Sequence, residues 1–460
     1  MAPLVAFSTS IHKTKNPMRS FDLVVAGNGP AGASLACVVA AAHPHLRVAV
    51  ADAAAASRRP PSAAPDCRVL ALSPASAAVL GEAGVWERVL DSGRVAPYYS
   101  MAVWEASGPG QIRFNAGEAG RAALGYVAEN WLVQELLQQR LLELPNVTLF
   151  ESCGVASVSL PALGGPAPAL VTLAQGETLK TLLLACCDGA ASPVARLAGL
   201  GGRVGWKYGQ QALVCAVQLA EGTLSSTAFQ RFLPGGPVLA LLPMFDNYAS
   251  VVWSTTPAHA RLLAALPEAD FLTHLQRAFV APLASPSLIG SWVASLSSPA
   301  PTIPAIERVA GPRASFPLQA SQASSYVGSR VALVGDAAHT MHPLAGQGFN
   351  LGLADVECLA RLVGDSVRDG QDIGGHIVLS EYESSRFKEN AVAVLGVDSL
   401  HKIFSVNWEP FVLARGGEKM ISFSFLLFSS FSSNSWDVNR GYALAHQICS
   451  CCSRDRNQSA

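Results

Sequence analysis

The first two hundred residues alternate between apolar runs and segments with helical spacing. Residues 21–26 are apolar except for Asp22, which predicts a buried strand, and the small residues at 33–42 predict a helix. Residues 47–51 predict a second buried strand. Because buried strands alternate with helices, this part of the chain predicts an α/β fold with a parallel sheet.

The middle of the chain carries a different pattern. Loose alternation at residues 98–114 predicts strands of a half-buried sheet, and leucines at helical spacing predict a helix over 130–144. Further strands are expected at residues 155–160, 169–174 and 181–185. Short apolar strands between residues 206 and 253, followed by a helical pattern at 258–280, predict a separate antiparallel sheet with a helix on it.

A short apolar strand at residues 331–334 stops at Gly335 and Asp336. This leaves an acidic side chain at the carboxyl end of a strand, which is where ligands bind in α/β sheets. The stretch therefore predicts a ligand site that includes Asp336.

The turn after this strand is apolar, with Pro343 and Leu344, and small residues at Gly346 and Gly348 lead into a helix that begins near Asn350. The first turn of a helix offers unpaired N–H groups and a positive dipole end. We therefore expect a flat ligand with a carbonyl group here, and a surface loop with two turn glycines is the alternative.

The amino-terminal strand runs directly into a glycine-rich turn. Gly27, Gly29 and Gly32 follow the GxGxxG pattern between a strand and a helix, the context in which this pattern binds a dinucleotide pyrophosphate. Asp52 ends the second strand, where it would accept hydrogen bonds from a ribose or else cap a helix. Arg68 is either a ligand donor or a solvated surface residue. No second GxGxxG follows a strand, so we expect one dinucleotide site.

Composition narrows the class of protein. The 460 residues are 50% hydrophobic and 14% charged, enough for two or three packed modules. The net charge of −1 and the lack of a dense Lys and Arg run argue against a nucleic-acid partner. No apolar run approaches the ~20 residues of a membrane span, so any membrane contact would be peripheral.

Two compositional details bear on compartment and metal content. The ten cysteines are irregularly spaced and mostly lie in apolar segments, which is typical of a reducing compartment. Residues 1–20 contain basic residues and no acid, which suits a targeting segment or an unremarkable start. The tail group of His446, Cys449, Cys451 and Cys452 lacks a strand or turn scaffold, so no metal is expected.

The chain resembles the two-domain flavoprotein aromatic hydroxylases in three motifs. These are GxGxxG near the start, Asp188-Gly189 in the middle, and GDAAH, P, GQG and N in that order near the end. The stretches RVLALSPASAAVL, WKYGQQALVCAV, RFLPGGPVLALLPM, VVWSTTPAHA and VALVGDAAHTMHPLAGQGFNLGLAD are most similar to the ubiquinone-biosynthesis monooxygenases. The resemblance covers roughly residues 20–415. It implies a Rossmann-like FAD-binding domain combined with an antiparallel β-sheet substrate domain.

The resemblance also implies roles for individual residues at FAD. They are Gly27, Gly29 and Gly32 at the pyrophosphate, Asp52 at the adenosine ribose, Arg68 and Gln134 at the phosphates, Asp188 in the mid-chain motif, Asp336 at the ribityl chain, and Gly346, Gly348 and Asn350 at the isoalloxazine. The catalytic wall would consist of Pro343, Leu344 and Gly348, which keep water away and hold the flavin. No side-chain acid or base and no catalytic triad is expected.

The resemblance implies the following division of the chain: a targeting segment at 1–20, the FAD-binding domain at 21–97, 126–205 and 313–415 (the last with C-terminal helices), the substrate domain at 98–125 and 206–312, and an atypical tail at 416–460. Two segments depart from the family. Cys186 and Cys187 replace small residues before Asp188, and Arg196 comes one position late. The Phe/Ser-rich and Cys-rich tail replaces the family's last helical segment.

The implied activity is hydroxylation of a polyprenylated hydroxybenzoate-type ring by a flavin C4a-hydroperoxide, with O₂ as co-substrate. The lack of a second dinucleotide cradle favours ferredoxin and its reductase as electron donors. Other quinone-biosynthesis proteins and the membrane surface would be partners, on the matrix side of the mitochondrial inner membrane. A non-catalytic flavin-binding subunit and a different flavin monooxygenase are the alternatives, while the lack of Trp-x-Trp argues against a halogenase.

Overall fold

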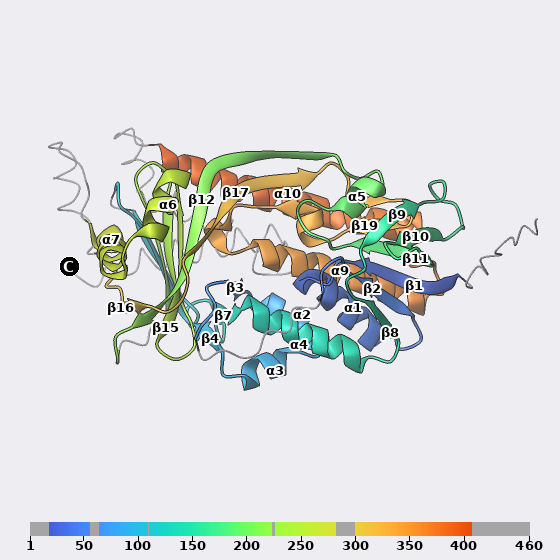
Figure 1. Cartoon of the computed structure of the whole chain (residues 1–460), viewed down its shortest axis with the longest axis horizontal. Helices are drawn as coiled ribbons and strands as arrows, with labels where there is room; N and C mark the ends of the chain where they lie inside the picture. The colour runs from blue at the N-terminus through green and yellow to red at the C-terminus, as the bar shows by residue number, and fades with distance from the viewer. Residues whose placement is uncertain (1–17, 56–63, 109, 223–225, 282–299, 407–460) are drawn as a thin grey trace, which may run out of the picture.

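The computed structural model describes residues 18–55, 64–108, 110–222, 226–281 and 300–406. Most of the expected targeting segment and the whole expected tail at 416–460 therefore lie outside the described residues. The described chain forms two large sheets, one at each end of an elongated molecule, with a third small sheet between them (Figure 1).

The first sheet is built from both halves of the chain. Its order is β18-β19-β11-β1-β2-β8, and all neighbours from β19 to β8 are parallel. Its strands are β1 (Arg19–Ala26), β2 (Val48–Ala51), β8 (Val147–Phe150), β11 (Thr178–Cys186), β18 (Val327–Gly328) and β19 (Val331–Leu333), with β9 (Val155–Ser159) and β10 (Ala169–Leu173) as an antiparallel extension. This confirms the predicted parallel sheet.

Strand β1 lies where the order of this sheet reverses. The chain adds β2 and β8 on one side of β1 and later adds β11 and β19 on the other side. In register, Ala26 at the end of β1 pairs with both Ala51 and Cys186. The carboxyl ends of the strands therefore meet at one edge, and ligands of open α/β sheets bind at such a reversal.

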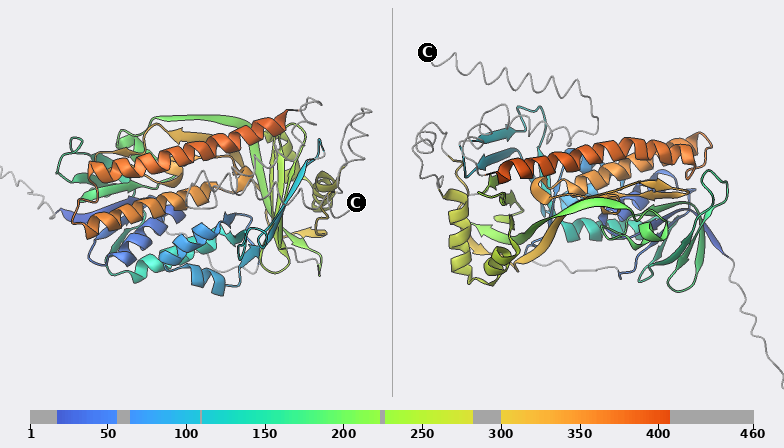
Figure 2. Two further views of the ribbon diagram at one scale, coloured as in Figure 1. Left: turned by 180° about the vertical axis from the view of Figure 1, so that it is seen from behind. Right: turned by 90° about the horizontal axis from the view of Figure 1, so that it is seen from above.

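Helix α1 (Pro30–Ala42) packs beside this sheet, between α4 (Asn130–Glu143) and α9 (Gly348–Arg368). Short apolar side chains let α1 pack closely, since residues from Gly32 to Ala40 are buried. Helix α10 (His376–Ser405) packs on α9 and continues along the molecule toward the second large sheet (Figure 2).

The second sheet has the order β20-β17-β12-β15-β14-β13-β5-β6, with β16 also paired to β12. Its strands are β5 (Ser100–Glu105), β6 (Gln111–Asn115), β12 (Arg203–Leu219), β13 (Thr227–Phe232), β14 (Val238–Pro243), β15 (Tyr248–Thr255), β16 (Ile306–Val309), β17 (Ala314–Ala323) and β20 (His339–Thr340). All pairs are antiparallel except β13 with β5. This confirms the predicted antiparallel sheet, which continues past residue 312 because β17 pairs with β12.

Two expectations for this region need correction. The segment from residue 203 begins not with short strands but with a single strand of 17 residues, β12, which runs from one module to the other (Figure 1). The helical pattern at 258–280 is two helices, α6 (Pro257–Ala265) and α7 (Glu268–Val280). They are separate because Pro267 has no N–H with which to continue α6.

The third sheet, with the order β3-β7-β4, joins the two modules. It consists of β3 (Val69–Leu72), β4 (Val95–Tyr98) and β7 (Gly125–Glu129), accompanied by α2 (Pro74–Glu82) and α3 (Trp86–Asp91). Ser73 caps α2 through a hydrogen bond from the N–H of Ser76, as its position before Pro74 predicted. Within the described segments, no helix combines the length and apolar character that crossing a bilayer requires.

Candidate functional site

The glycine turn after β1 contains glycines of two kinds. Gly27 has a φ of +106°, and a Cβ added there would lie 2.5 Å from the carbonyl oxygen of Cys187. A Cβ added to Gly32 would lie 2.1 Å from the carbonyl oxygen of Gly27. Gly29 has ordinary extended backbone, and an added Cβ would meet nothing within 4 Å. The protein itself therefore does not require glycine at position 29, and open space beside it fits a ligand that approaches the backbone closely.

Asp52 follows β2 and turns its carboxylate toward the glycine turn. One carboxylate oxygen accepts a hydrogen bond from the backbone N–H of Asn28 at 2.5 Å, and the other accepts one from the N–H of Ala54 at 2.7 Å. Asp52 thus supports the turn itself and lies half-exposed beside it, at the position expected for contact with a ribose.

Helices α1 and α9 begin on two sides of Gly335. A Cβ added to Gly335 would lie 3.4 Å from the Cβ of Ala31 in α1 and 3.8 Å from the Cα of Gly352 in α9. Neither helix has a side-chain hydrogen bond at its N-cap. The amides of both first turns lack intrahelical partners, so two positive helix ends converge on one region that suits phosphate and carbonyl oxygens.

Asp336 lies in the short 3₁₀ turn η1 (Gly335–Ala337) between these helix ends. Its side chain reaches solvent, while the protein atoms around it raise its pKa by desolvation against the opposing effects of His339 and Arg203. Arg203 holds the backbone of this turn, donating to the carbonyl oxygen of Ala337 at 2.6 Å and to that of Asp336 at 3.2 Å. Sequence reasoning missed Arg203, because a lone arginine 133 residues away carries no motif.

A buried charge network lies beneath the same turn. Asp355 of α9 accepts hydrogen bonds from the N–H of Gly335 at 3.0 Å and from Nε2 of His339 at 2.7 Å. Its second oxygen accepts from Nε of Arg386 at 2.8 Å and from Nδ2 of Asn390 at 2.9 Å. Burial opposes ionisation of Asp355, but His339 and Arg386 outweigh it and lower the pKa to about 2. The network locks α10 and α9 to the turn that carries Asp336.

Asn350 ties the first turn of α9 to the third sheet. Its side-chain oxygen accepts hydrogen bonds from the N–H of Ser73 at 2.9 Å and from the hydroxyl of Ser76 at 2.6 Å. Its amide nitrogen donates to the carbonyl oxygens of Ala71 at 2.8 Å and Gly346 at 3.2 Å. The side chain of Asn350 is therefore fully used within the protein, so any contact with a ligand falls to its backbone.

The expected catalytic wall precedes this helix. The 3₁₀ turn η2 (Pro343–Ala345) places Leu344 in an apolar cluster, and the N–H groups of Leu344 and Gly346 are already hydrogen-bonded to His342 and Pro343. Pro343 and Leu344 can therefore offer an apolar surface to a ligand, whereas free hydrogen-bond donors come from the backbone N–H groups at the start of α9, at Gly348.

The mid-chain Asp188 supports the first turn of the short helix α5 (Pro193–Leu197), whose N-cap is Ser192. Its carboxylate accepts hydrogen bonds from the hydroxyl of Ser192 and from the N–H of Val194, the latter at 3.0 Å. Cys186 and Cys187 are buried, and burial raises the pKa of both thiols. Protonated buried thiols pack as small apolar residues, so the structure accommodates this departure from the family pattern at the end of β11.

Arg68 and Gln134 are the two remaining residues expected at the phosphates. The Arg68 side chain is 67% exposed and lies 4.0 Å from the carboxylate of Asp66. Gln134 is half-buried on α4. No hydrogen bond among the described residues joins either side chain to the glycine turn, and their contact with phosphates remains an expectation.

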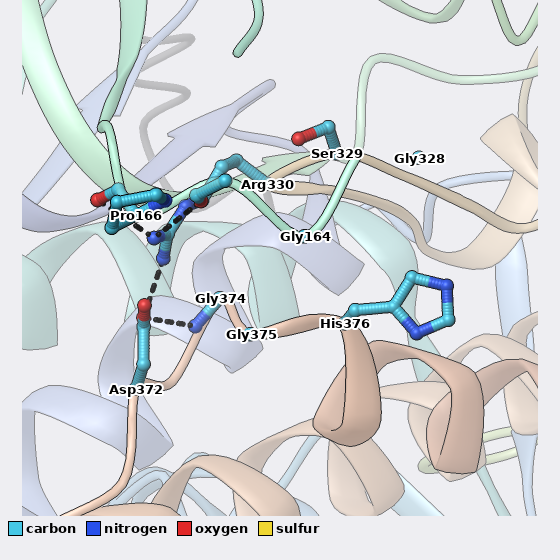
Figure 3. Close-up of a pocket in the computed structure, with 10 residues that line it drawn as sticks. Gly164, Pro166, Gly328, Ser329, Arg330, Asp372, Gly374, Gly375 and His376 are labelled. Atoms are coloured by element: carbon cyan, nitrogen blue, oxygen red, sulfur yellow. Dashed lines mark hydrogen bonds and ion pairs between the residues drawn. The ribbon is translucent and has the colours of Figure 1, made fainter. Parts of the chain in front are cut away.

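A separate small cavity of about 200 Å³ lies beside Arg330, at the amino end of β19 and thus at the opposite edge of the first sheet (Figure 3). The guanidinium of Arg330 is paired with Asp372 at 2.5 Å and donates to the carbonyl oxygen of Pro166 at 3.1 Å. The cation that lines this cavity is therefore already paired within the protein. Across the described segments, no group of three metal-binding side chains gathers.

Comparison with known proteins shows which proteins this chain is similar to. Residues 20–298 and 299–391 match a family model described as FAD binding domain. The chain is 36% identical to the mitochondrial ubiquinone biosynthesis monooxygenase COQ6 of Xenopus tropicalis, over 86% of this chain and 88% of the relative. It is 33% identical to COQ6 of Homo sapiens, over 86% and 88%.

Solved structures share the fold. PqsL of P. aeruginosa, crystallised with 2-aminobenzoylacetate, aligns with a TM-score of 0.68 at 21% identity and covers 86% of this chain and 99% of its own. The p-nitrophenol 4-monooxygenase PnpA of Pseudomonas putida DLL-E4 aligns with a TM-score of 0.64 at 19% identity, covering 91% and 100%.

Proposed function

This chain belongs to the FAD-dependent monooxygenases of ubiquinone biosynthesis, and from that membership we propose that it hydroxylates the aromatic ring of a polyprenylated hydroxybenzoate-type intermediate. The observation that supports the proposal most is the open space beside Gly29, at the point where two uncapped helix ends converge. A glycine that the fold does not need is explained by a bound cofactor.

FAD fits the residues present. Gly29 and the first turn of α1 would receive the pyrophosphate, and Asp52 the adenosine ribose. Asp336 would take the hydroxylated chain, and the first-turn amides of α9 at Gly348 a carbonyl group of the ring system. When bound, FAD supplies the activation of O₂ and the oxygen atom that enters the substrate ring.

The chain's own contribution at the ring is orientation and exclusion of water. Leu344 is buried in an apolar cluster with Phe232 of β13 and Phe404 of α10, whose rings stack with centroids 3.9 Å apart. An apolar wall between the second sheet and α10 suits a substrate with a long hydrocarbon tail, and it keeps water from the reacting atoms. A phenolic ring already carries electron density, so we assign no side-chain nucleophile.

We further propose a setting for this reaction. The named relatives are mitochondrial, and we place this chain on the matrix face of the inner membrane, bound peripherally. Electrons would come from ferredoxin and its reductase, and other quinone-biosynthesis proteins would be neighbours. The single GxGxxG turn supports this choice of donor.

The test is product identification. The purified FAD-loaded protein is supplied with a polyprenylated 4-hydroxybenzoate, O₂ and reduced ferredoxin, and a product heavier by one oxygen atom is sought by mass spectrometry. A protein that holds flavin but forms no such product would support the alternative of a non-catalytic flavin-binding subunit.

The matched site variant is Asp336→Ala. Loss of a hydrogen bond to a charged acceptor is expected to weaken FAD binding at least ~10-fold. Asp369→Ala, an exposed acid just beyond the far end of α9, is the control. Unchanged FAD affinity in Asp336→Ala would count against the placement of the flavin.

A further inference from the structure

His342 stands directly before the proposed flavin wall and is 1% exposed. Its Nδ1 accepts a hydrogen bond from the backbone N–H of Leu344 at 3.0 Å, and this bond caps η2. The orientation of the imidazole and the position of Leu344 are therefore coupled, so whatever holds the ring also holds the wall.

The accepting role of Nδ1 determines the tautomer of His342. A ring nitrogen that accepts a hydrogen bond carries no proton, so the neutral ring must carry its proton on Nε2. This Nε2 lies 3.4 Å from Oε1 of Gln210, and Nε2 of His401 lies 3.2 Å from the same oxygen. A carbonyl oxygen has two lone pairs, so Gln210 can accept from both imidazoles at once.

Gln210 and Tyr208 lie in strand β12, at a bulge in its pairing with β17. Its pairing with β17 shifts register between Lys207 and Gln211, and Gly209 inside the shift has a φ of +67°. Such bulges re-aim side chains. The ring of Tyr208 lies edge-on against both imidazoles, with centroids 4.8 Å away in each case.

The charged groups near His342, His401 and Tyr208 come from α10. Asp398 pairs with Lys402 at 2.6 Å and accepts a hydrogen bond from Nε1 of Trp206 at 2.8 Å. Burial and then His401 lower the pKa of His342 to about 3, with Asp398 opposing. His342 is therefore neutral at physiological pH, in agreement with the tautomer that the hydrogen bonds require.

We propose that Gln210, Tyr208 and His401 are positioning residues that hold His342 in its Nε2–H tautomer, and that His342 thereby fixes the Leu344 turn against which the flavin ring packs. The inference deepens the proposed function, because it rests on placement of the flavin beside Pro343 and Leu344. The inference also gives a role to the bulge in β12, because none of the residues assigned to FAD lies in that bulge.

Two substitutions of His342 separate its hydrogen bond from its bulk. His342→Leu removes the acceptor for the Leu344 N–H and is expected to weaken FAD binding about three- to tenfold and to shift the visible absorption of the bound flavin. His342→Asn offers a side-chain oxygen that can accept the same N–H from the same cap position. It is expected to restore FAD affinity to within about twofold of the wild type, together with the wild-type spectrum.

Gln210 has a matched control in the next residue. Gln210→Leu frees both imidazoles and is expected to shift the flavin spectrum in the same direction as His342→Leu. The side chain of Gln211 instead accepts from the hydroxyl of Ser315 at 3.3 Å, so Gln211→Leu should leave the spectrum unchanged. Thermal unfolding of each variant without FAD shows whether it is folded, and Gln210→Leu and His342→Asn keep the test decisive if His342→Leu fails to fold.

The outcomes separate this inference from the site placement. Wild-type FAD affinity and spectrum in both His342→Leu and Gln210→Leu would overturn the inference, while a weakened Asp336→Ala would still uphold the placement. His342→Asn as defective as His342→Leu would also overturn it, because the cap would then not be the relevant contact. If Asp336→Ala, His342→Leu and Gln210→Leu all bind FAD normally, both the placement and the inference fail.

Discussion

Gly29 differs from Gly27 and Gly32 in whether the protein's own packing requires a residue without a side chain. At Gly27 and Gly32 an added Cβ would collide with backbone atoms of the protein, whereas at Gly29 it would enter empty space. Gly27 and Gly32 are therefore required by the fold, whereas the fold does not require glycine at position 29, which agrees with the proposed contact with a ligand. The sequence pattern alone does not make this distinction, because all three positions read as one motif.

This distinction gives a prediction at the residue scale. Gly29→Ala is expected to leave the unfolding free energy of the FAD-free protein within about 1 kcal/mol of the wild type. Alanine reduces the freedom of the unfolded chain, and its weaker preference for the N-cap position of α1 opposes that gain. FAD should bind at least ~10-fold more weakly, because the methyl group occupies ligand space. Thermal unfolding without FAD and FAD titration measure the two effects.

Gly32→Ala is the contrasting variant, since its Cβ would lie 2.1 Å from a carbonyl oxygen. It should destabilise the protein even without FAD. Equal FAD affinity in Gly29→Ala and the wild type would show that no ligand passes beside this residue.

At the scale of elements, one carboxylate connects α9, α10 and the turn that carries Asp336. Asp355 is fully buried and accepts from His339, Arg386 and Asn390 as well as from the backbone. A buried charge in such a network is costly to leave unpaired. The relative position of the two long helices therefore depends on this residue.

Asp355→Asn is expected to lower the unfolding free energy by about 3 kcal/mol at neutral pH, because the buried Arg386 loses its buried carboxylate partner and keeps the half-exposed Glu389. The folded-state pKa of Asp355 is lowered from 3.8 to about 2, so its contribution is fully present above about pH 4 and is lost as the pH falls toward 2. The difference between wild type and variant should therefore shrink over that range in denaturant titrations.

The control is Asp365→Asn on the exposed face of α9, where Asp365 pairs with Arg361 at 3.3 Å and also with the exposed Arg368. An exposed pair contributes at most about 1 kcal/mol, so this variant should stay close to the wild type. A difference for Asp355→Asn that is the same at pH 7 and near pH 2 would contradict the assignment of the pKa.

At the scale of the whole molecule, β12 and α10 run between the two modules (Figure 1). Together they carry the residues that meet at the proposed flavin wall. Relative motion of the modules would therefore be resisted by two continuous elements rather than by a loop.

One prediction at this scale concerns electrons. If the donor is a ferredoxin, NADPH alone should bleach the bound flavin slowly in the absence of air, and addition of ferredoxin and its reductase should accelerate bleaching. Visible absorption follows the reaction. Rapid bleaching by NADPH alone would show that a dinucleotide reaches the flavin without a second GxGxxG turn.

A second prediction concerns the membrane. If attachment is peripheral, the protein in a mitochondrial membrane fraction should be released by high salt or by carbonate, because screening and deprotonation weaken surface contacts. Immunoblots of pellet and supernatant measure the release. Retention in the pellet after carbonate washing would indicate an anchor that inserts into the bilayer.

The sequence by itself determined the elements and motifs that depend on short spans of chain. The β1–α1 unit with Gly27, Gly29 and Gly32, the acids Asp52 and Asp336 after their strands, and the antiparallel character of the second sheet were all predicted from periodicity and turn residues within about twenty positions. Family resemblance added FAD as the cofactor, which the comparisons confirm.

Only the tertiary structure decided which side chains meet across long separations. Arg203 reaches the backbone of Asp336 from 133 positions away, and His342 meets Gln210 across 132 positions. The full length of β12 also came from the fold. The physical reason is that periodicity reports the face of an element, whereas the partner on that face is set by how sheets and helices pack.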